Sequence, residues 1–146
     1  MKYTQKVKIK DLSFEKSISE FKNFEFVKYL TMYQPIKIMK WEGIKNGDIA
    51  FFKLWFFGWK NFRVKHSNYS KNKNEFLFVD YGIDLPFGLQ SWQHEHKVVK
   101  KNSGVIIIDS LNIEHKNKIL GFLLFPILLF PILIRKISYK LYFLKF

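Results

Sequence analysis

The feature that most constrains this sequence is a long run of short strand-like segments followed by one long apolar segment. Between Ile36 and Glu114, apolar and polar residues alternate in short stretches separated by Asn- and Gly-containing turns. Such spacing is typical of antiparallel hairpins. The last segment, residues 119–146, is too long for one strand and predicts a helix. Strands that precede a single long helix indicate an α+β fold rather than a parallel α/β fold.

The 146 residues fit one domain, 1–146, because no linker or repeat divides them. Ser13 is a candidate N-cap for a first short helix, and a second is expected at about 24–30, before Pro35. We expect six or seven antiparallel strands. The candidate segments are residues 6–10, 36–42, 48–55, 59–67, 75–83, 90–99 and 104–114.

The charge of the chain limits its partners. The formal net charge is +13, yet only Arg63 and Arg135 among the 25 basic residues are arginines. Nucleic-acid-binding proteins favour arginine and cluster their charge, whereas these lysines are scattered. We therefore expect solvated lysine faces and no nucleic-acid partner, with an anionic membrane surface as the second interpretation. No cysteine is present, which excludes disulfides and Cys-ligated zinc. The first residues show no secretory signal, so we expect a cytoplasmic protein, peripheral at a membrane in the second interpretation.

Alternation in segment 90–99 identifies its inner face. One face carries amide and charged side chains, and the other carries Trp92, His94 and His96. Because successive side chains of a strand point to opposite sides, these three residues should face the concave interior. By the same rule, Phe62 and Val64 point inward.

A carboxylate is expected beside the two imidazoles. If the hairpin loop is 100–103, His94 lies opposite Asp109, and Trp92 lies opposite Leu111. A buried His–Asp pair satisfies both partners. Four interpretations stay open for the pair: a structural contact, a polar anchor for a ligand, general acid–base catalysis by His94, His96 and Asp109, or a metal site.

We expect no metal and no cofactor, because no third ligand stands at a recognisable spacing from the two histidines. Asp80 and Asp84 lie near an expected loop, so we expect them to be solvated or paired with lysine.

Several motifs resemble a known family. They are Phe78-Val79-Asp80, Leu85-Pro86-Phe87, Trp92-Gln93-His94-Glu95-His96, Asp109, and Arg135 with Tyr139. Together they resemble the ligand-binding SRPBCC proteins, relatives of START lipid-transfer domains, polyketide cyclases and the birch pollen allergen. The resemblance implies a helix-grip fold, in which a curved antiparallel sheet grips the C-terminal helix around a hydrophobic tunnel. It implies no fixed catalytic set.

The pocket expected from these faces and from the resemblance has thirteen lining residues. They are Phe62, Val64, Phe78, Trp92, His94, His96, Ile107, Asp109, Leu111, Leu128, Ile132, Arg135 and Tyr139. Pro126 and Pro131 depart from the pattern. Since proline is best tolerated in a first helical turn, we expect the last helix to start near one of them, with 120–130 as an apolar flap.

Three functions follow from this reading. The leading hypothesis is the binding of a small hydrophobic molecule, a lipid, polyketide-like or aromatic compound, without catalysis. The second is a cyclase, dehydratase or isomerase in which His94 or His96 moves a proton. The third is docking of segment 119–134 on a membrane or, as a homodimer, on a second copy.

Overall fold

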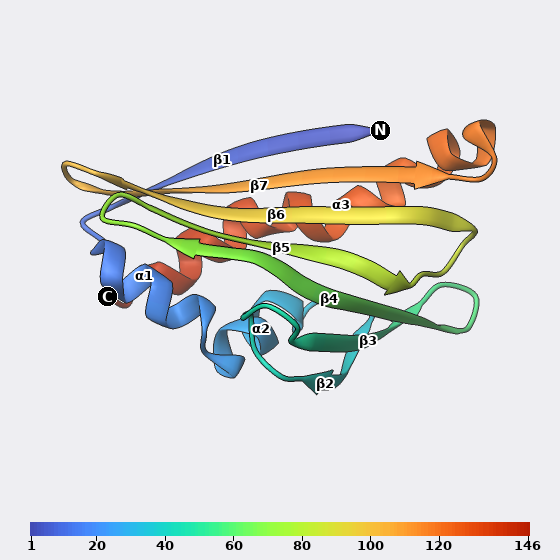
Figure 1. Ribbon diagram of the computed structural model, residues 1–146, viewed down its shortest axis with the longest axis horizontal. Helices are drawn as coiled ribbons and strands as arrows, with labels where there is room; N and C mark the ends of the chain where they lie inside the picture. The colour runs from blue at the N-terminus through green and yellow to red at the C-terminus, as the bar shows by residue number, and fades with distance from the viewer.

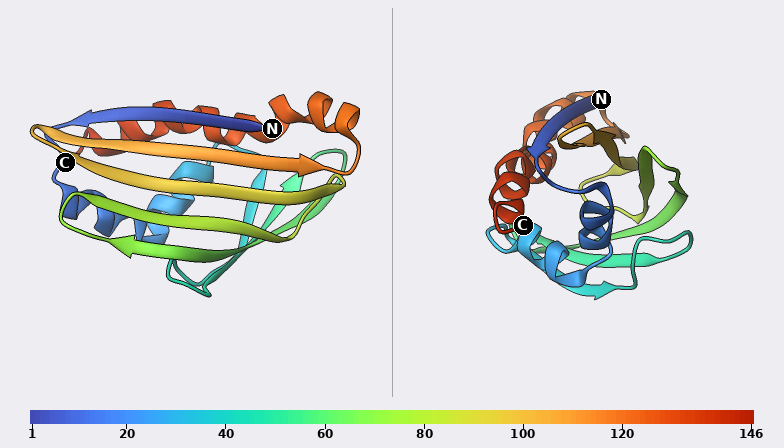
Figure 2. Two further views of the ribbon diagram at one scale, coloured as in Figure 1. Left: turned by 45° about the horizontal axis from the view of Figure 1, so that its top comes forward. Right: turned by 90° about the vertical axis from the view of Figure 1, so that its left-hand side faces the viewer.

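The computed structural model describes residues 1–146 as a seven-stranded antiparallel sheet with three helices (Figure 1). The strand order is β1-β7-β6-β5-β4-β3-β2. Viewed along the strands, the sheet curls into an open arc, and α3 lies along the open side (Figure 2). This arrangement is the helix-grip fold that the sequence predicts, with seven strands.

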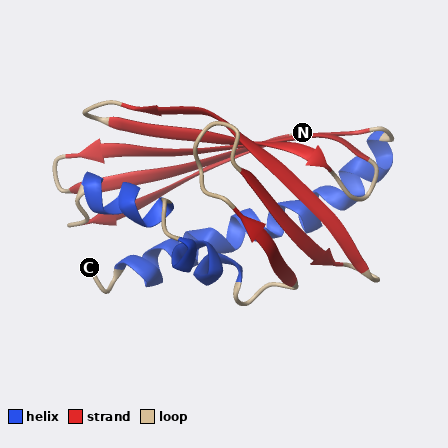
Figure 3. Cartoon of the chain, turned by 60° about the horizontal axis from the view of Figure 1, so that its bottom comes forward, coloured by secondary structure: helices blue, strands red, loops and turns tan.

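The elements follow the expected order along the chain. Their bounds are β1 Lys2–Lys10, α1 Phe14–Phe21, α2 Phe24–Thr31, β2 Ile36–Trp41, β3 Ile49–Trp55, β4 Trp59–Lys71, β5 Glu75–Asp84, β6 Leu89–Lys101, β7 Gly104–His115 and α3 Lys118–Phe143. Figure 3 shows α1 and α2 beside the C-terminal half of α3. The side chains of Ser13 and Asn23 cap α1 and α2, respectively, because each accepts a hydrogen bond from a backbone N–H group in the first turn.

The β6–β7 hairpin is tighter than we expected. Lys101 pairs with Gly104, so the turn is two residues rather than four, and the register moves by two. His96 therefore lies opposite Asp109, while His94 lies opposite Leu111. Because side chains alternate with a period of two, a shift of two keeps every residue on its expected face. The predicted faces are confirmed, and the predicted partners of His94 and Trp92 are wrong.

The start of α3 also differs from the expectation. The helix is continuous over Lys118–Phe143 and contains Pro126 and Pro131 in its interior. Asn117 caps it by accepting from the N–H groups of Ile119 and Leu120. Pro126 is exposed, so water can reach the carbonyl that it leaves without a partner. Packing of the inner side on the sheet outweighs the cost of the prolines, and the flap expected at 120–130 is helix.

Two apolar clusters form the core, one at each end of the sheet. On β6, Trp92 belongs to one cluster and Val98 to the other, with His94 and His96 between them. On β7, Asp109 has the same intermediate position. The fold therefore places a polar group of residues in its middle, between two hydrophobic cores.

Candidate functional site

The polar residues in the middle of the sheet come from neighbouring strands. Cross-strand pairing puts His66 of β4 opposite Asp80 of β5, and Asp80 opposite His94 of β6. One step along, His96 lies opposite Asp109 of β7. Directly opposed residues share a face of the sheet. The pairing therefore collects three imidazoles and two carboxylates on the concave side.

Asp109 is the fully buried anchor of this group. Its carboxylate accepts hydrogen bonds from His94 Nε2 at 3.1 Å, from Gln5 Nε2 at 3.2 Å and from the Tyr139 hydroxyl at 3.2 Å. Burial alone would raise the pKa of Asp109, but the hydrogen bonds and charges around it hold that pKa well below its ordinary value. Asp109 is therefore ionised and fixes the rings that point at it.

His96 bridges the two carboxylates. Its Nε2 lies 2.9 Å from Asp80 Oδ2, and its Nδ1 lies 3.4 Å from Asp109 Oδ1. Burial lowers the pKa of His96, but the charge of Asp80 and the hydrogen bonds to both carboxylates outweigh it and raise the pKa. Arg135 approaches the same place from α3, with Nη1 3.5 Å from His96 Nδ1. The result is a compact network of alternating charges.

His94 differs from His96 in charge. Burial, and then the positive charge of His96, lower the pKa of His94 to about 4, so this ring is neutral at pH 7. Its Nε2–H donates to Asp109, which leaves Nδ1 as an acceptor. The nearest carboxylate oxygen to that nitrogen, Asp80 Oδ2, is 3.9 Å away, beyond hydrogen-bond distance.

Asp80 and His66 are the site residues that our sequence interpretation missed. Asp80 does not pair with lysine: its Oδ1 lies 2.9 Å from His66 Nε2. Asp84, for which the same environment was expected, is half-exposed, and its carboxylate lies 3.6 Å from the Arg63 guanidinium. The signal for His66 was present, because the alternation that places Phe62 and Val64 inside continues to His66. Asp80 sits well inside β5, not at the loop, and the pairing with His66 holds it there.

A cavity of about 470 Å³ opens beside this network. Apolar side chains of β3, β4, β6 and α3 form most of its wall, and His94, Asp80 and Arg135 supply polar groups. Seven of the thirteen expected residues line it: Phe62, Val64, Trp92, His94, Leu128, Ile132 and Arg135. Phe78 and His96 line a smaller adjoining space of about 70 Å³.

Four expected lining residues lie outside both spaces. They are Ile107, Asp109, Leu111 and Tyr139, each at most 1% exposed. Ile107 and Tyr139 pack in the core around α1 and α2, and the Tyr139 hydroxyl donates a hydrogen bond to Asp109. The C-terminal half of α3 packs directly on the sheet there, which leaves no room for a ligand.

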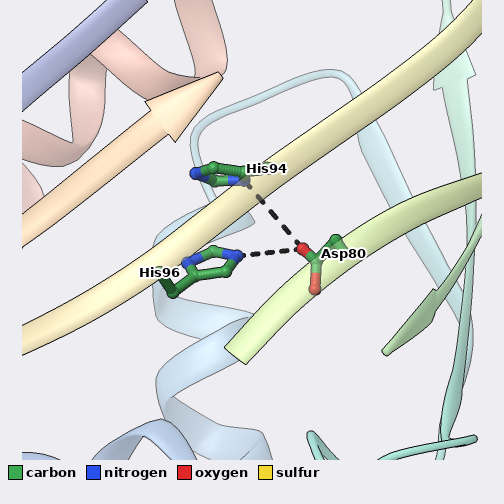
Figure 4. Close-up of side chains that lie close together, drawn as sticks. All are labelled: Asp80, His94 and His96. Carbon is green, nitrogen blue, oxygen red and sulfur yellow. Dashed lines mark hydrogen bonds and ion pairs between the residues drawn. The ribbon is translucent and has the colours of Figure 1, made fainter. Parts of the chain in front are cut away.

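The arrangement distinguishes the chemical possibilities. An imidazole that is walled off by side chains can only hold structure, but His94 reaches the cavity wall. A neutral ring with a free Nδ1 can accept a hydrogen bond or a proton from a bound molecule. Asp80, His94 and His96 also bring three metal-ligand atoms within 4.8 Å of one another (Figure 4). Asp80 is thus a third candidate ligand, which the sequence spacing did not reveal.

Comparison with known proteins supports the fold. No family model matches the chain, and no curated protein has a significant sequence match. Norcoclaurine synthase from Thalictrum flavum, solved with dopamine and hydroxybenzaldehyde, aligns with a TM-score of 0.65 at 13% identity over 99% of this chain and 86% of its own. Ara h 8.0201 aligns at 0.59 and 11% over 100% and 99%, and the major latex-like protein 151 of Panax ginseng at 0.59 and 13% over 95% of each. These neighbours share the helix-grip fold of the birch pollen allergen type, the fold implied by the sequence motifs.

Proposed function

We propose that this helix-grip protein binds a small amphipathic molecule whose apolar body fills the cavity and whose polar end meets His94, Asp80 and Arg135. The observation that carries the proposal is a 470 Å³ cavity with a largely apolar wall and a few placed polar groups. Ligand sites in proteins have this size and composition. Three of the lining residues, Trp55, Ile127 and Phe130, are exposed and apolar, which favours the entry of an apolar molecule.

The polar groups narrow the chemistry of the ligand. His94 Nδ1 offers an acceptor, and the Arg135 guanidinium, with 18% of its side chain exposed, offers donors and a positive charge. A hydroxyl group satisfies the imidazole, and a carboxylate satisfies Arg135. We therefore favour hydrophobic alcohols and acids over pure hydrocarbons.

A fluorescence titration tests this function. The probe is a long-chain fatty acid with a fluorophore at its apolar end, added to the purified protein. We expect saturable binding that Leu128→Trp weakens. Leu128 is buried in the cavity wall, and the larger indole side chain would fill part of the cavity. Leu141→Trp is the matched control, since Leu141 is exposed on the same helix. Equal affinities of both variants and the original protein would contradict binding in the cavity.

A second function, docking on an anionic membrane, is favoured by the outer side of α3. Large apolar residues cover that side, and several are more than half exposed: Ile119, Phe122, Leu123, Phe130, Ile137 and Leu141. By length and composition alone α3 could cross a membrane, but its inner side packs on the sheet. The β3–β4 turn lies at the same end of the molecule as the start of α3 (Figure 1). This turn carries the exposed Phe57.

Positive charge around this surface favours an anionic partner. Lys116 and Lys118 precede the apolar stretch, Lys136 and Lys140 lie within its last turns, and the chain carries +13. A second copy would bring the same positive charge, whereas anionic lipids attract it. Apolar area that remains in contact with water needs such a partner.

Vesicle flotation tests the docking. We expect binding to vesicles of phosphatidylcholine with phosphatidylglycerol and little binding to phosphatidylcholine alone. The double substitution Phe122→Ser and Leu123→Ser should abolish binding. Tyr33→Ser, at a still more exposed position outside α3, should not. A dimer in light scattering that the double substitution dissociates, without any vesicle binding, would show that a second copy covers the face.

A further inference from the structure

We propose that Asp80, His94 and His96 bind one divalent transition-metal ion at the wall of the cavity. Figure 4 shows the two imidazoles of β6 and the carboxylate of β5 turned toward one another. Asp80 Oδ2 lies 2.9 Å from His96 Nε2 and 3.9 Å from His94 Nδ1. Bonds of about 2.0–2.1 Å in a tetrahedral site separate ligand atoms by about 3.3 Å. The two distances bracket that value, and the three ligand atoms all lie within 4.8 Å of one another, so side-chain movements alone would complete the site.

The second polar atom of each ligand already lies close to a possible partner. Asp109 Oδ1 accepts from His94 Nε2 at 3.1 Å and lies 3.4 Å from His96 Nδ1, while His66 Nε2 lies 2.9 Å from Asp80 Oδ1. Metal-binding histidines commonly donate their other N–H to a carboxylate, which fixes the ring and the tautomer. Here those contacts leave His94 Nδ1 and His96 Nε2 turned toward Asp80.

The charge of the network suits a cation. With neutral imidazoles, two carboxylates and the Arg135 guanidinium give the buried group a formal charge of −1. A divalent cation is therefore attracted to the group, and its binding requires both imidazole ligands to be neutral. Arg135 lies near Nδ1 of His96, across the ring from the nitrogen that would bind the metal.

The ligand set selects the class of ion. Two imidazole nitrogens and one carboxylate oxygen suit Zn²⁺, Co²⁺ or Fe²⁺ rather than Mg²⁺ or Ca²⁺, which prefer oxygen. Three protein ligands leave at least one position open, as in catalytic rather than structural sites. Asp80 and His94 both line the 470 Å³ cavity, so that open position faces the bound molecule. The ion would then bind the oxygen of an alcohol or acid ligand directly.

Cobalt titration of the intact protein tests the site. The protein is stripped with a chelator, dialysed and titrated with Co²⁺, with visible absorption as the readout. We expect d–d bands that saturate at one ion per chain and disappear on addition of Zn²⁺. Asp80→Asn and His96→Gln should abolish them. The controls Asp84→Asn and His115→Gln, a carboxylate at the end of the same strand and a histidine outside the network, should keep them. Failure to saturate, or bands unchanged in Asp80→Asn, would overturn the proposal.

A measurement on the unaltered protein covers the case in which a variant fails to fold. Imidazole ¹⁵N spectra during Zn²⁺ addition should show changes at His94 Nδ1 and His96 Nε2, with His94 Nε2 still protonated. Changes confined to His115, or no change in any ring, would overturn the proposal. The fatty-acid probe is titrated into chelator-treated protein without added metal, so its binding and the binding of cobalt can succeed or fail separately.

Discussion

Replacing Asp109 by asparagine is the most direct way to weigh the buried network. Asp109→Asn keeps the shape of the side chain but removes its charge and replaces one acceptor oxygen by an NH₂ donor. In the original protein, the carboxylate accepts hydrogen bonds from three groups, which belong to His94, Gln5 and Tyr139. An amide oxygen cannot accept from all of them, and the new NH₂ group faces other donors.

The magnitude follows from these contacts. A buried donor without an acceptor costs about 1–3 kcal/mol, and removing one partner of a buried ion pair costs about 3–5 kcal/mol. The two descriptions overlap, because both count the same lost contacts. We therefore expect a loss of about 3–5 kcal/mol in the free energy of unfolding. For a chain of this size each kcal/mol lowers Tm by about 2–4 °C, which gives a decrease of about 6–20 °C.

Thermal unfolding monitored by circular dichroism provides the assay, with Asp84→Asn as the control. Asp84 pairs with Arg63 at 3.6 Å, and both side chains are more than 40% exposed. Such a surface pair contributes about 0–1 kcal/mol, so the control should shift Tm by less than about 4 °C. A Tm for Asp109→Asn equal to or above that of the control would refute the network as a stabilising group.

Three other perturbations test separate parts of the fold. Burial raises the pKa of Glu20, but hydrogen bonds from Tyr142 and Lys16 lower it below 4.5 overall; its stabilisation is therefore present above pH 4.5 and lost as pH falls through the lower folded pKa. In urea unfolding, the stability gap between the original protein and Glu20→Gln should shrink from pH 7 to pH 3, and a constant gap would contradict this. Pro126→Ala should raise stability by about 1–2 kcal/mol, because it restores a helical N–H at an interior position; a helix that began at Pro126 would instead lose stability. Gly104→Ala should destabilise more than Gly47→Ala, since both glycines have positive φ but only the first would place a Cβ 2.1 Å from a backbone oxygen of β1; equal losses would argue against that close approach.

The sequence predicted the faces of the strands better than their partners. Polar–apolar alternation alone placed His94 and His96 inside, because burial acts on every second residue. The register depends on the turn, and residues 100–103 were compatible with either a four-residue or a two-residue loop. With the shorter loop, Lys101 pairs with Gly104, and Asp109 comes to lie opposite His96. The contact between His94 and Asp109 nevertheless exists, as a diagonal one at 3.1 Å.

Two other misses have tertiary causes. Asp80 lies within the strand expected at 75–83, but its closeness to a Pro-Phe loop in the sequence suggested a solvated carboxylate or a lysine partner. Only the neighbouring strands bring His66 and His96 to its carboxylate. In α3, the local cost of Pro126 and Pro131 favoured a later start. The packing of residues such as Leu128 and Ile132 on the sheet overrides that preference.

Native mass spectrometry tests the central claim, that the cavity binds a small amphipathic molecule, most directly. The protein is purified gently from cells of its source, without detergent, and its mass is compared with the mass after denaturation. We expect one non-covalent adduct per chain, retained in Leu141→Trp and lost in Leu128→Trp, with extraction into organic solvent yielding a hydrophobic alcohol or acid. Adduct-free protein that also fails to take up the fatty-acid probe, or an adduct retained equally by both variants, would contradict the account.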